Sequence, residues 1–158
     1  MRPAPYDTLL DDETWAFIDK SAAFYPEDAG NLDHHGKRDV YDALCRAFDT
    51  GRPAGVTVRD FSISGPGGPI PVREYMPRAG EPAASIIYLH GGGFILGGLE
   101  SHDSICAEFC DRTGYRVTAV NYRLAPEHLH PAQFDDALAA FRLLAAEAGH
   151  PVILSGDS

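Results

Sequence analysis

The sequence predicts an α/β fold in which a mostly parallel sheet is entered through an antiparallel hairpin, behind an N-terminal helical segment. Three observations support this prediction. Residues 1–50 place apolar residues at helical spacing, residues 56–76 change to two extended runs around a turn, and residues 85–155 alternate strand-like and helical runs. Strands that alternate with helices are typical of parallel sheets, because a parallel connection needs a crossover element.

Two helices are expected in the first 50 residues. One begins after Asp11 or Asp12, which is a good capping residue, and the other runs from about Lys37 to Phe48 with apolar residues at helical spacing. The segment GRPAG at 51–55 then interrupts the helical pattern and predicts a short linker.

This division predicts two parts of the chain. Residues 1–50 form a helical segment, and residues 51–158 form the part that contains the hairpin and the alternating strands and helices. The first part holds 11 Asp plus Glu against 5 Lys plus Arg, so most of the chain's net charge of -10 lies there. We therefore expect the acidity to bear mainly on this helical segment and its surroundings.

The hairpin is expected in residues 56–76. VTVRDFSIS at 56–64 and IPVREYM at 70–76 are rich in residues that favour strands, and the cluster GPGGP at 65–69 favours a tight turn between them. Two extended runs joined by a short turn predict antiparallel pairing.

Three strands and two helices follow the hairpin. SIIYLH at 85–90, YRVTAVNYR at 115–123 and PVILS at 151–155 are largely apolar, as expected of strands buried on both faces of a parallel sheet. Helical spacing predicts helices at 102–114 and 131–149, each ended by a glycine.

The apolar spacing also predicts which faces of these helices are buried. The first helix is expected to bury Ile105, Cys106, Phe109 and Cys110. The second is expected to bury Phe134, Ala137, Leu138, Phe141, Leu144 and Ala145. We interpret Cys106 and Cys110 as small core hydrophobes and the compartment as reducing, which predicts a cytoplasmic protein.

Composition excludes several classes of protein. The chain has 13 Lys plus Arg against 23 Asp plus Glu, which argues against nucleic acid and anionic membranes as main partners. No stretch approaches 18 consecutive apolar residues, and the first 15 residues lack the apolar core of a signal peptide. No histidine or cysteine spacing fits zinc, so neither metal nor cofactor is expected.

The first chemical motif is His90-Gly91-Gly92-Gly93-Phe94, directly after a predicted buried strand. Three glycines let the backbone turn tightly and present N–H groups to a ligand. Such donors suit the oxyanion of acyl transfer. A flexible turn or a phosphate loop remains the alternative, although neither full phosphate-loop pattern fits.

The second motif is Gly156-Asp157-Ser158 after the strand PVILS. A strand, a glycine and a serine two residues later form the first half of a nucleophile elbow, in which serine projects from a strained turn. By itself the tripeptide is more typical of an ordinary polar turn than of a nucleophile elbow.

The third motif is YRLAPE at 122–127, followed by Pro131-Ala132. We interpret this segment as scaffold, stiffened by its prolines. An ion pair between Arg123 and Glu127 would order the loop.

Together the three motifs resemble the bacterial hormone-sensitive-lipase-like carboxylesterases, which have the α/β-hydrolase fold and show HGGG, YRLAPE…PA and GDSAGG in this order. The first two motifs are present in full and the third as far as its serine. The resemblance covers about residues 55–158. It implies that residues 1–50 are a helical cap segment and that residues 51–158 are the N-terminal half of an α/β-hydrolase catalytic domain, which is incomplete in this chain.

The resemblance also implies site residues. Ser158 matches the nucleophile, and Gly92 and Gly93 match the glycines whose amides form the oxyanion hole. His90 and Gly91 match residues that support this loop, so His90 is not expected to act as the base. The substrate implied is a small ester with a short acyl chain.

In that family the catalytic Asp or Glu and the His follow the serine in the chain. We therefore expect a complementary C-terminal segment to supply them, and residues 1–158 alone to be inactive. A homo-oligomer remains open. The alternative function is a non-catalytic protein that binds a small ligand on the same fold, as in the plant gibberellin receptors.

Overall fold

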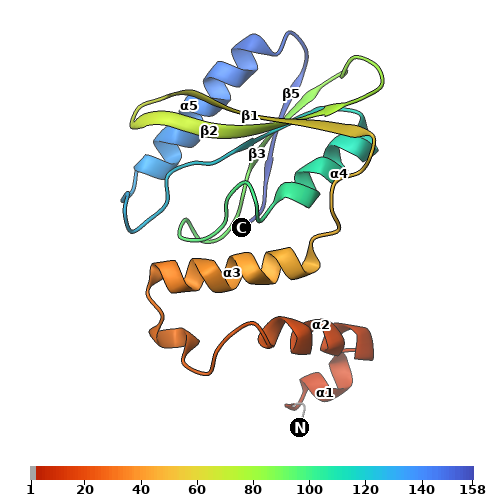
Figure 1. Cartoon of the computed structure of the whole chain (residues 1–158), viewed down its shortest axis with the longest axis vertical. Helices are drawn as coiled ribbons and strands as arrows, with labels where there is room; N and C mark the ends of the chain where they lie inside the picture. Colours follow the sequence, from red (N-terminus) through yellow and green to blue (C-terminus); the bar gives the residue numbers. More distant parts are fainter. Residues whose placement is uncertain (1–2) are drawn as a thin grey trace.

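The computed structural model describes residues 3–158, so Met1 and Arg2 of the expected cap segment lie outside the described residues. Its centre is a five-stranded sheet with the order β1-β2-β4-β3-β5 (Figure 1). The strands are β1 (Val56–Gly65), β2 (Gly68–Pro77), β3 (Ser85–Leu89), β4 (Arg116–Val120) and β5 (Val152–Gly156). β1 and β2 form the expected antiparallel hairpin, and β3 runs parallel to both β4 and β5. The predicted α/β fold is confirmed.

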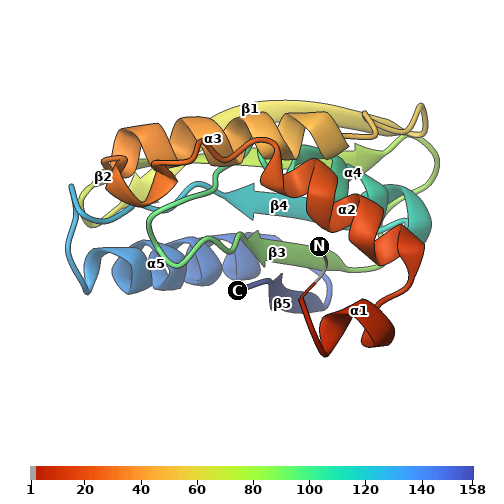
Figure 2. The same ribbon diagram turned by 90° about the horizontal axis from the view of Figure 1, so that it is seen from below.

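The two faces of this sheet are covered by different helices. α4 (Asp103–Thr113) packs on the face that carries Tyr88, and α5 (Ala132–Glu147) packs on the face that carries Ile87. Successive side chains of a strand point to opposite faces, so the apolar run of β3 is buried on both sides. Figure 2 shows β4, β3 and β5 following one another across the sheet.

The buried face of α4 differs from the predicted one. Cys106 and Cys110 are fully buried as expected, but Ile105 is 44% exposed and Phe109 is 39% exposed. Asp103 is buried in their place, because its carboxylate is paired with arginine side chains. A helix on a flat sheet buries only a narrow stripe, so the apolar residues on its flank stay exposed.

The buried face of α5 was also predicted wrongly in part. Phe134 is 60% exposed, whereas Gln133, Asp136 and Ala140 are buried against the sheet and the neighbouring loop. Polar side chains can occupy a buried stripe when they find hydrogen-bond partners there. Gln133 does so by donating to the His128 carbonyl, and Asp136 by accepting from Arg123.

β5 is an exposed edge strand in the part of the chain that the structure describes, although its apolar sequence is typical of a strand that is covered on both faces. β5 pairs only with β3 and forms one edge of the sheet. Ile153 is 43% exposed and Leu154 is 56% exposed. An apolar edge of this kind is a surface on which another strand or helix can pack.

The N-terminal helices lie apart from the sheet, at the end where the chain reaches Ser158 (Figure 1). They are α1 (Tyr6–Leu9), α2 (Asp12–Ala22), the short 3-10 helix η1 (Ala29–Asn31) and α3 (His34–Phe48). The carboxylates of Asp11 and Asp33 cap α2 and α3 by accepting from the amides of Thr14 and Gly36. α3 begins three residues before the predicted start, because Asp33 provides this cap.

A search of the described helices finds none with the length and apolar character needed to cross a membrane.

Candidate active site

The glycine-rich loop after β3 has an unusual backbone. Gly92, Gly93 and Phe94 have consecutive positive φ angles of 116°, 60° and 63°. Glycine adopts these angles without strain, whereas phenylalanine does so at a cost. Among residues 3–158, the amides of Gly92 and Gly93 donate to no protein acceptor. Two adjacent N–H groups are therefore free to bind an anionic oxygen.

Gly91 joins this loop to the turn after β5. Its amide donates a hydrogen bond of 2.9 Å to Oδ1 of Asp157. A Cβ atom at position 91 would lie 2.3 Å from Oδ2 of Asp157 and 2.6 Å from the carbonyl carbon of Ser158. Only glycine fits here, and its lack of a side chain lets the loop lie directly against Ser158.

Asp157 is held by three groups, two from β3 and the loop directly after it and one from the residue before α4. Besides the Gly91 amide, the Tyr88 hydroxyl donates to Oδ1 at 2.8 Å, and Nε2 of His102 lies 3.2 Å from Oδ2. Burial opposes ionisation of this carboxyl, but the hydrogen bonds from Tyr88 and Gly91 outweigh it and lower its pKa. Asp157 is therefore ionised at neutral pH and connects β3, α4 and the turn before Ser158.

His90 is buried directly after β3 and supports the start of the glycine loop. Its ring stacks on Tyr122 with centroids 4.3 Å apart, and its Nδ1 donates to the Gly91 carbonyl at 2.8 Å. The Tyr122 hydroxyl donates to the His90 carbonyl. Burial lowers the pKa of His90, so its imidazole is neutral at pH 7. These contacts fix the path of the chain from β3 into the loop.

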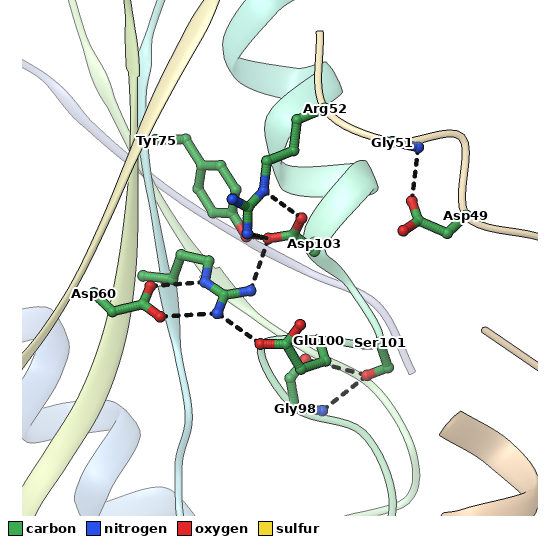
Figure 3. A network of polar contacts seen from close by, with 10 residues as sticks. Asp49, Gly51, Arg52, Asp60, Tyr75, Gly98, Glu100, Ser101 and Asp103 are labelled. Atoms are coloured by element: carbon green, nitrogen blue, oxygen red, sulfur yellow. Dashed lines mark hydrogen bonds and ion pairs between the residues drawn. The ribbon is translucent and has the colours of Figure 1, made fainter. Parts of the chain in front are cut away.

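A buried cluster of charges holds the start of α4, next to His102. Figure 3 shows the Asp103 carboxylate accepting from Arg52 at 2.6 Å and from the Tyr75 hydroxyl at 2.8 Å. Arg73, with a side chain only 7% exposed, donates to Asp103 at 2.8 Å. It also pairs with the carboxylates of Asp60 and Glu100, which are more exposed than that of Asp103.

This cluster was not foreseen from the sequence. Asp103 is the residue after His102, so anchoring Asp103 also anchors the imidazole that contacts Asp157. The signals available were a charged residue inside a predicted strand, Arg73, and an acidic residue near the start of a predicted helix, Asp103.

The YRLAPE segment makes different ion pairs from the predicted one. Arg123 does not pair with Glu127; instead its guanidinium binds Asp136 of α5 through two hydrogen bonds of 2.8 Å. Glu127 pairs with Arg38 of α3 at 2.6 Å. The predicted pair assumed local contact, but residues 123 and 127 lie in an irregular loop where a separation of four does not bring side chains together.

A cavity of about 670 Å³ opens beside the loop. Its walls are mostly apolar or aromatic: Leu89, His90, Gly93, Phe94, Ile95, Tyr122, Ala125, His130, Gln133, Phe134, Ala137 and Asp157 line it. A pocket of this size with a few polar groups on one side suits a small organic ligand.

A metal site has one candidate in the described residues. His34, His35 and Glu127 bring three ligand atoms within 4.8 Å of one another. Both oxygens of Glu127 already accept hydrogen bonds from Arg38, so a cation there would face the guanidinium charge. We assign no metal to this cluster.

Ser158 is exposed at the end of the turn after β5. Within residues 3–158 no side chain forms a hydrogen bond with its hydroxyl. The structure thus brings Ser158, Gly91 and Asp157 together and leaves the amides of Gly92 and Gly93 free, while no base lies against the serine in the part of the chain described.

Known proteins resemble this chain in sequence and in structure. Residues 86–158 match the family model described as the alpha/beta hydrolase fold. The carboxylic ester hydrolase LipN of Mycobacterium tuberculosis is 44% identical over 99 residues, which are 63% of this chain and 26% of that protein. The acetyl esterase of Salmonella typhi is 33% identical over 135 residues, which are 85% of this chain and 41% of that protein.

A solved structure agrees with these matches. The hyperthermophilic esterase from the archaeon Pyrobaculum calidifontis is 32% identical with a TM-score of 0.82, over 94% of this chain and 49% of that one. The chain therefore spans less than half the length of each of these three relatives. Its motifs, its fold and these matches agree: the chain has the α/β-hydrolase fold and is similar in sequence and structure to carboxylic ester hydrolases and esterases.

Proposed function

We propose that this chain supplies the nucleophile and the oxyanion hole of a serine carboxylic ester hydrolase that acts on small esters. One observation carries the proposal: the glycine loop lies against Ser158 through Gly91, with the free amides of Gly92 and Gly93 in the next two positions. The relatives named as ester hydrolases support the same assignment.

In this proposal Ser158 attacks the carbonyl carbon of the ester. Its Oγ forms a bond to that carbon while a general base takes the hydroxyl proton, and the carbonyl oxygen becomes an oxyanion that accepts from the amides of Gly92 and Gly93. The C–O bond to the alcohol then breaks, and the alcohol leaves with the proton. Water hydrolyses the acyl-serine by the same steps and releases the carboxylic acid.

The base and its acidic partner are proposed to come from a complementary C-terminal segment. Three observations support this. Ser158 has no hydrogen-bonded base within residues 3–158, β5 exposes an apolar edge, and the chain spans less than half the length of the three relatives described above. Residues 1–158 alone are then expected to be inactive, because an unassisted serine hydroxyl is a weak nucleophile.

The proposed substrate is an ester with a short acyl chain. The cavity beside the loop is supported as its binding site by its volume of about 670 Å³ and by Phe94, Tyr122 and Phe134 in its walls. Residues 1–50 act as the cap over this cavity in the proposal, which the contact of α3 with the YRLAPE segment supports.

A reducing compartment is part of the proposal. All three cysteines are free thiols, and Cys106 and Cys110 are fully buried beside Tyr88 in the core. Buried free thiols are typical of cytoplasmic proteins.

The test is hydrolysis of p-nitrophenyl acetate by the protein purified intact from the cells that make it, with its mass measured in parallel. Ser158→Ala is expected to abolish turnover, whereas Ser62→Ala, a change at an exposed position on β1, leaves it unchanged. Full turnover in Ser158→Ala would rule out the assignment. Saturable binding of a small apolar ligand without ester turnover would favour the ligand-binding alternative.

A further inference from the structure

Arg38 of α3 binds the backbone of two loops that are distant from each other in sequence. Its Nε donates to the Ile95 carbonyl at 2.7 Å, and its Nη2 donates to the Ala125 carbonyl at 2.9 Å. One loop follows β3 and carries the glycine motif, and the other follows β4 and carries YRLAPE. A single guanidinium thus connects the N-terminal helices to both loops.

Glu127 fixes the orientation of this guanidinium. Its two oxygens accept from Nη1 at 2.6 Å and from Nη2 at 2.8 Å, which is the bidentate geometry that only arginine provides. The hydrogen bond from Arg38 lowers the pKa of Glu127 to about 2, so the pair stays charged at neutral pH. The Arg38 side chain is 21% exposed, which leaves it largely shielded by the two loops.

Both carbonyl acceptors belong to residues of the cavity wall. Ile95 and Ala125 line the cavity, as do Gly93 and Phe94 on the same loop as Ile95. The two loops also bind each other directly, because the Ala125 amide donates to the Phe94 carbonyl at 2.9 Å. Arg38 bridges the loops on the side of α3, so its position affects how far apart the two walls lie.

We propose that Arg38 is a positioning residue that sets the separation of the two loops and thereby the acyl-chain selectivity of the cavity. This inference rests on the proposed function, because acyl selectivity presupposes ester hydrolysis. Arg38 does not touch the reacting atoms; it acts through the backbone of Ile95 and Ala125. Its removal frees both walls, which widens the space available to the acyl chain and loosens the amide of Gly93.

A role limited to attaching α3 predicts something different. If Arg38 only tethered the helix, its loss would lower stability and would affect all esters equally. A role in spacing the loops predicts a change in the ratio between short and long acyl chains. The ratio therefore separates the two roles.

The test compares Arg38→Met and Arg38→Lys with the matched control Arg112→Met in the intact protein. Arg112 forms an exposed pair with Glu108 within α4 and does not line the cavity. In Arg38→Met we expect kcat/KM for p-nitrophenyl acetate to fall about 10-fold or more, mainly through kcat, because small displacements of a site are costly. The fall for p-nitrophenyl octanoate is expected to be at least about fivefold smaller.

Arg38→Lys is expected to recover little of the lost selectivity, because one ammonium cannot bind a carboxylate and two carbonyls in a fixed plane. Arg112→Met is expected to match the unchanged protein for both esters. Equal losses for acetate and octanoate in Arg38→Met, or none, would overturn the proposal.

A second measurement does not depend on activity. Hydrogen exchange of the hydrogen-bonded amides of Ile95, Leu96 and Ala125 is expected to accelerate about 10-fold in Arg38→Met and not in Arg112→Met. Unchanged exchange would overturn the positioning role. If the unchanged protein hydrolyses no ester, the proposed function and the selectivity fail together, while accelerated exchange still supports the connection between Arg38 and the loops.

Discussion

The amide of Gly91 donates to the carboxylate of Asp157 at 2.9 Å, across 66 positions of sequence. This bond joins the glycine loop after β3 to the turn that carries Ser158. The two segments meet because β3 and β5 are parallel neighbours, so their carboxyl ends lie at the same edge of the sheet. The relationship between these two residues is the basis of the first two predictions.

Gly91→Ala is expected to displace the turn at Asp157 and Ser158. The new Cβ would lie 2.3 Å from the Asp157 carboxylate, so loop and turn must move apart. We expect the free energy of unfolding to fall by about 1–3 kcal/mol, and ester turnover to fall about 100-fold. Urea denaturation and p-nitrophenyl acetate hydrolysis measure these effects. Gly30→Ala is the control, since a Cβ there meets no atom within 4 Å; equal behaviour of the two variants would contradict the prediction.

Tyr88→Phe removes the hydroxyl that donates to Asp157 and leaves the ring in the core. We expect a loss of about 1 kcal/mol in the free energy of unfolding, because water still reaches the partly exposed carboxylate. The pKa of Asp157, followed by NMR, is expected to rise towards its ordinary value as one stabilising donor is lost. Tyr115→Phe serves as the comparison, since its hydroxyl has no hydrogen bond within residues 3–158. A pKa that stays low in Tyr88→Phe would show that the hydroxyl contributes nothing.

Stability is expected to decline as the pH falls below about 6.5 because of His90. Burial lowers the folded-state pKa of this residue below its ordinary value of about 6.5, so as the pH falls the unfolded chain binds a proton before the folded one does. The contribution of His90 to the free energy of unfolding is complete above about pH 6.5 and is lost progressively as the pH drops towards the folded-state pKa. Urea midpoints between pH 8 and 5.5 measure the slope, which should be smaller in His90→Gln. The same slope in both proteins would assign it to other groups.

Arg73→Met is expected to destabilise the fold strongly. The guanidinium is 7% exposed and pairs with Asp60, Glu100 and Asp103, so its loss leaves the first two carboxylates without this counter-charge and Asp103 with Arg52 alone. We expect a loss of about 3 kcal/mol in the free energy of unfolding. Arg59→Met breaks an ion pair with Glu74 in which the arginine is 68% exposed, and should cost less than about 1 kcal/mol. Similar thermal shifts for the two variants would contradict the role assigned to the buried cluster.

Much of the fold was predictable because its signals are local. The hairpin over residues 56–76 follows from alternating strand formers around a glycine turn, and the β–α order of residues 85–155 predicts parallel pairing. The order of the motifs along the chain also led to the family that the comparisons support. These features depend on the spacing and order of residues along the chain, and the sequence alone gives both.

The tertiary structure alone decided which charged groups meet. Glu127 pairs with Arg38 rather than with Arg123, and Arg123 pairs with Asp136, because the chain's path brings these groups together from different elements. Among 13 cationic and 23 anionic side chains, spacing in the sequence does not select partners outside a helix. The contact of Gly91 with Asp157 has the same origin. The motifs specify the chemical groups that each segment carries, but the pairing of β3 with β5 in the sheet sets the distance between the two segments.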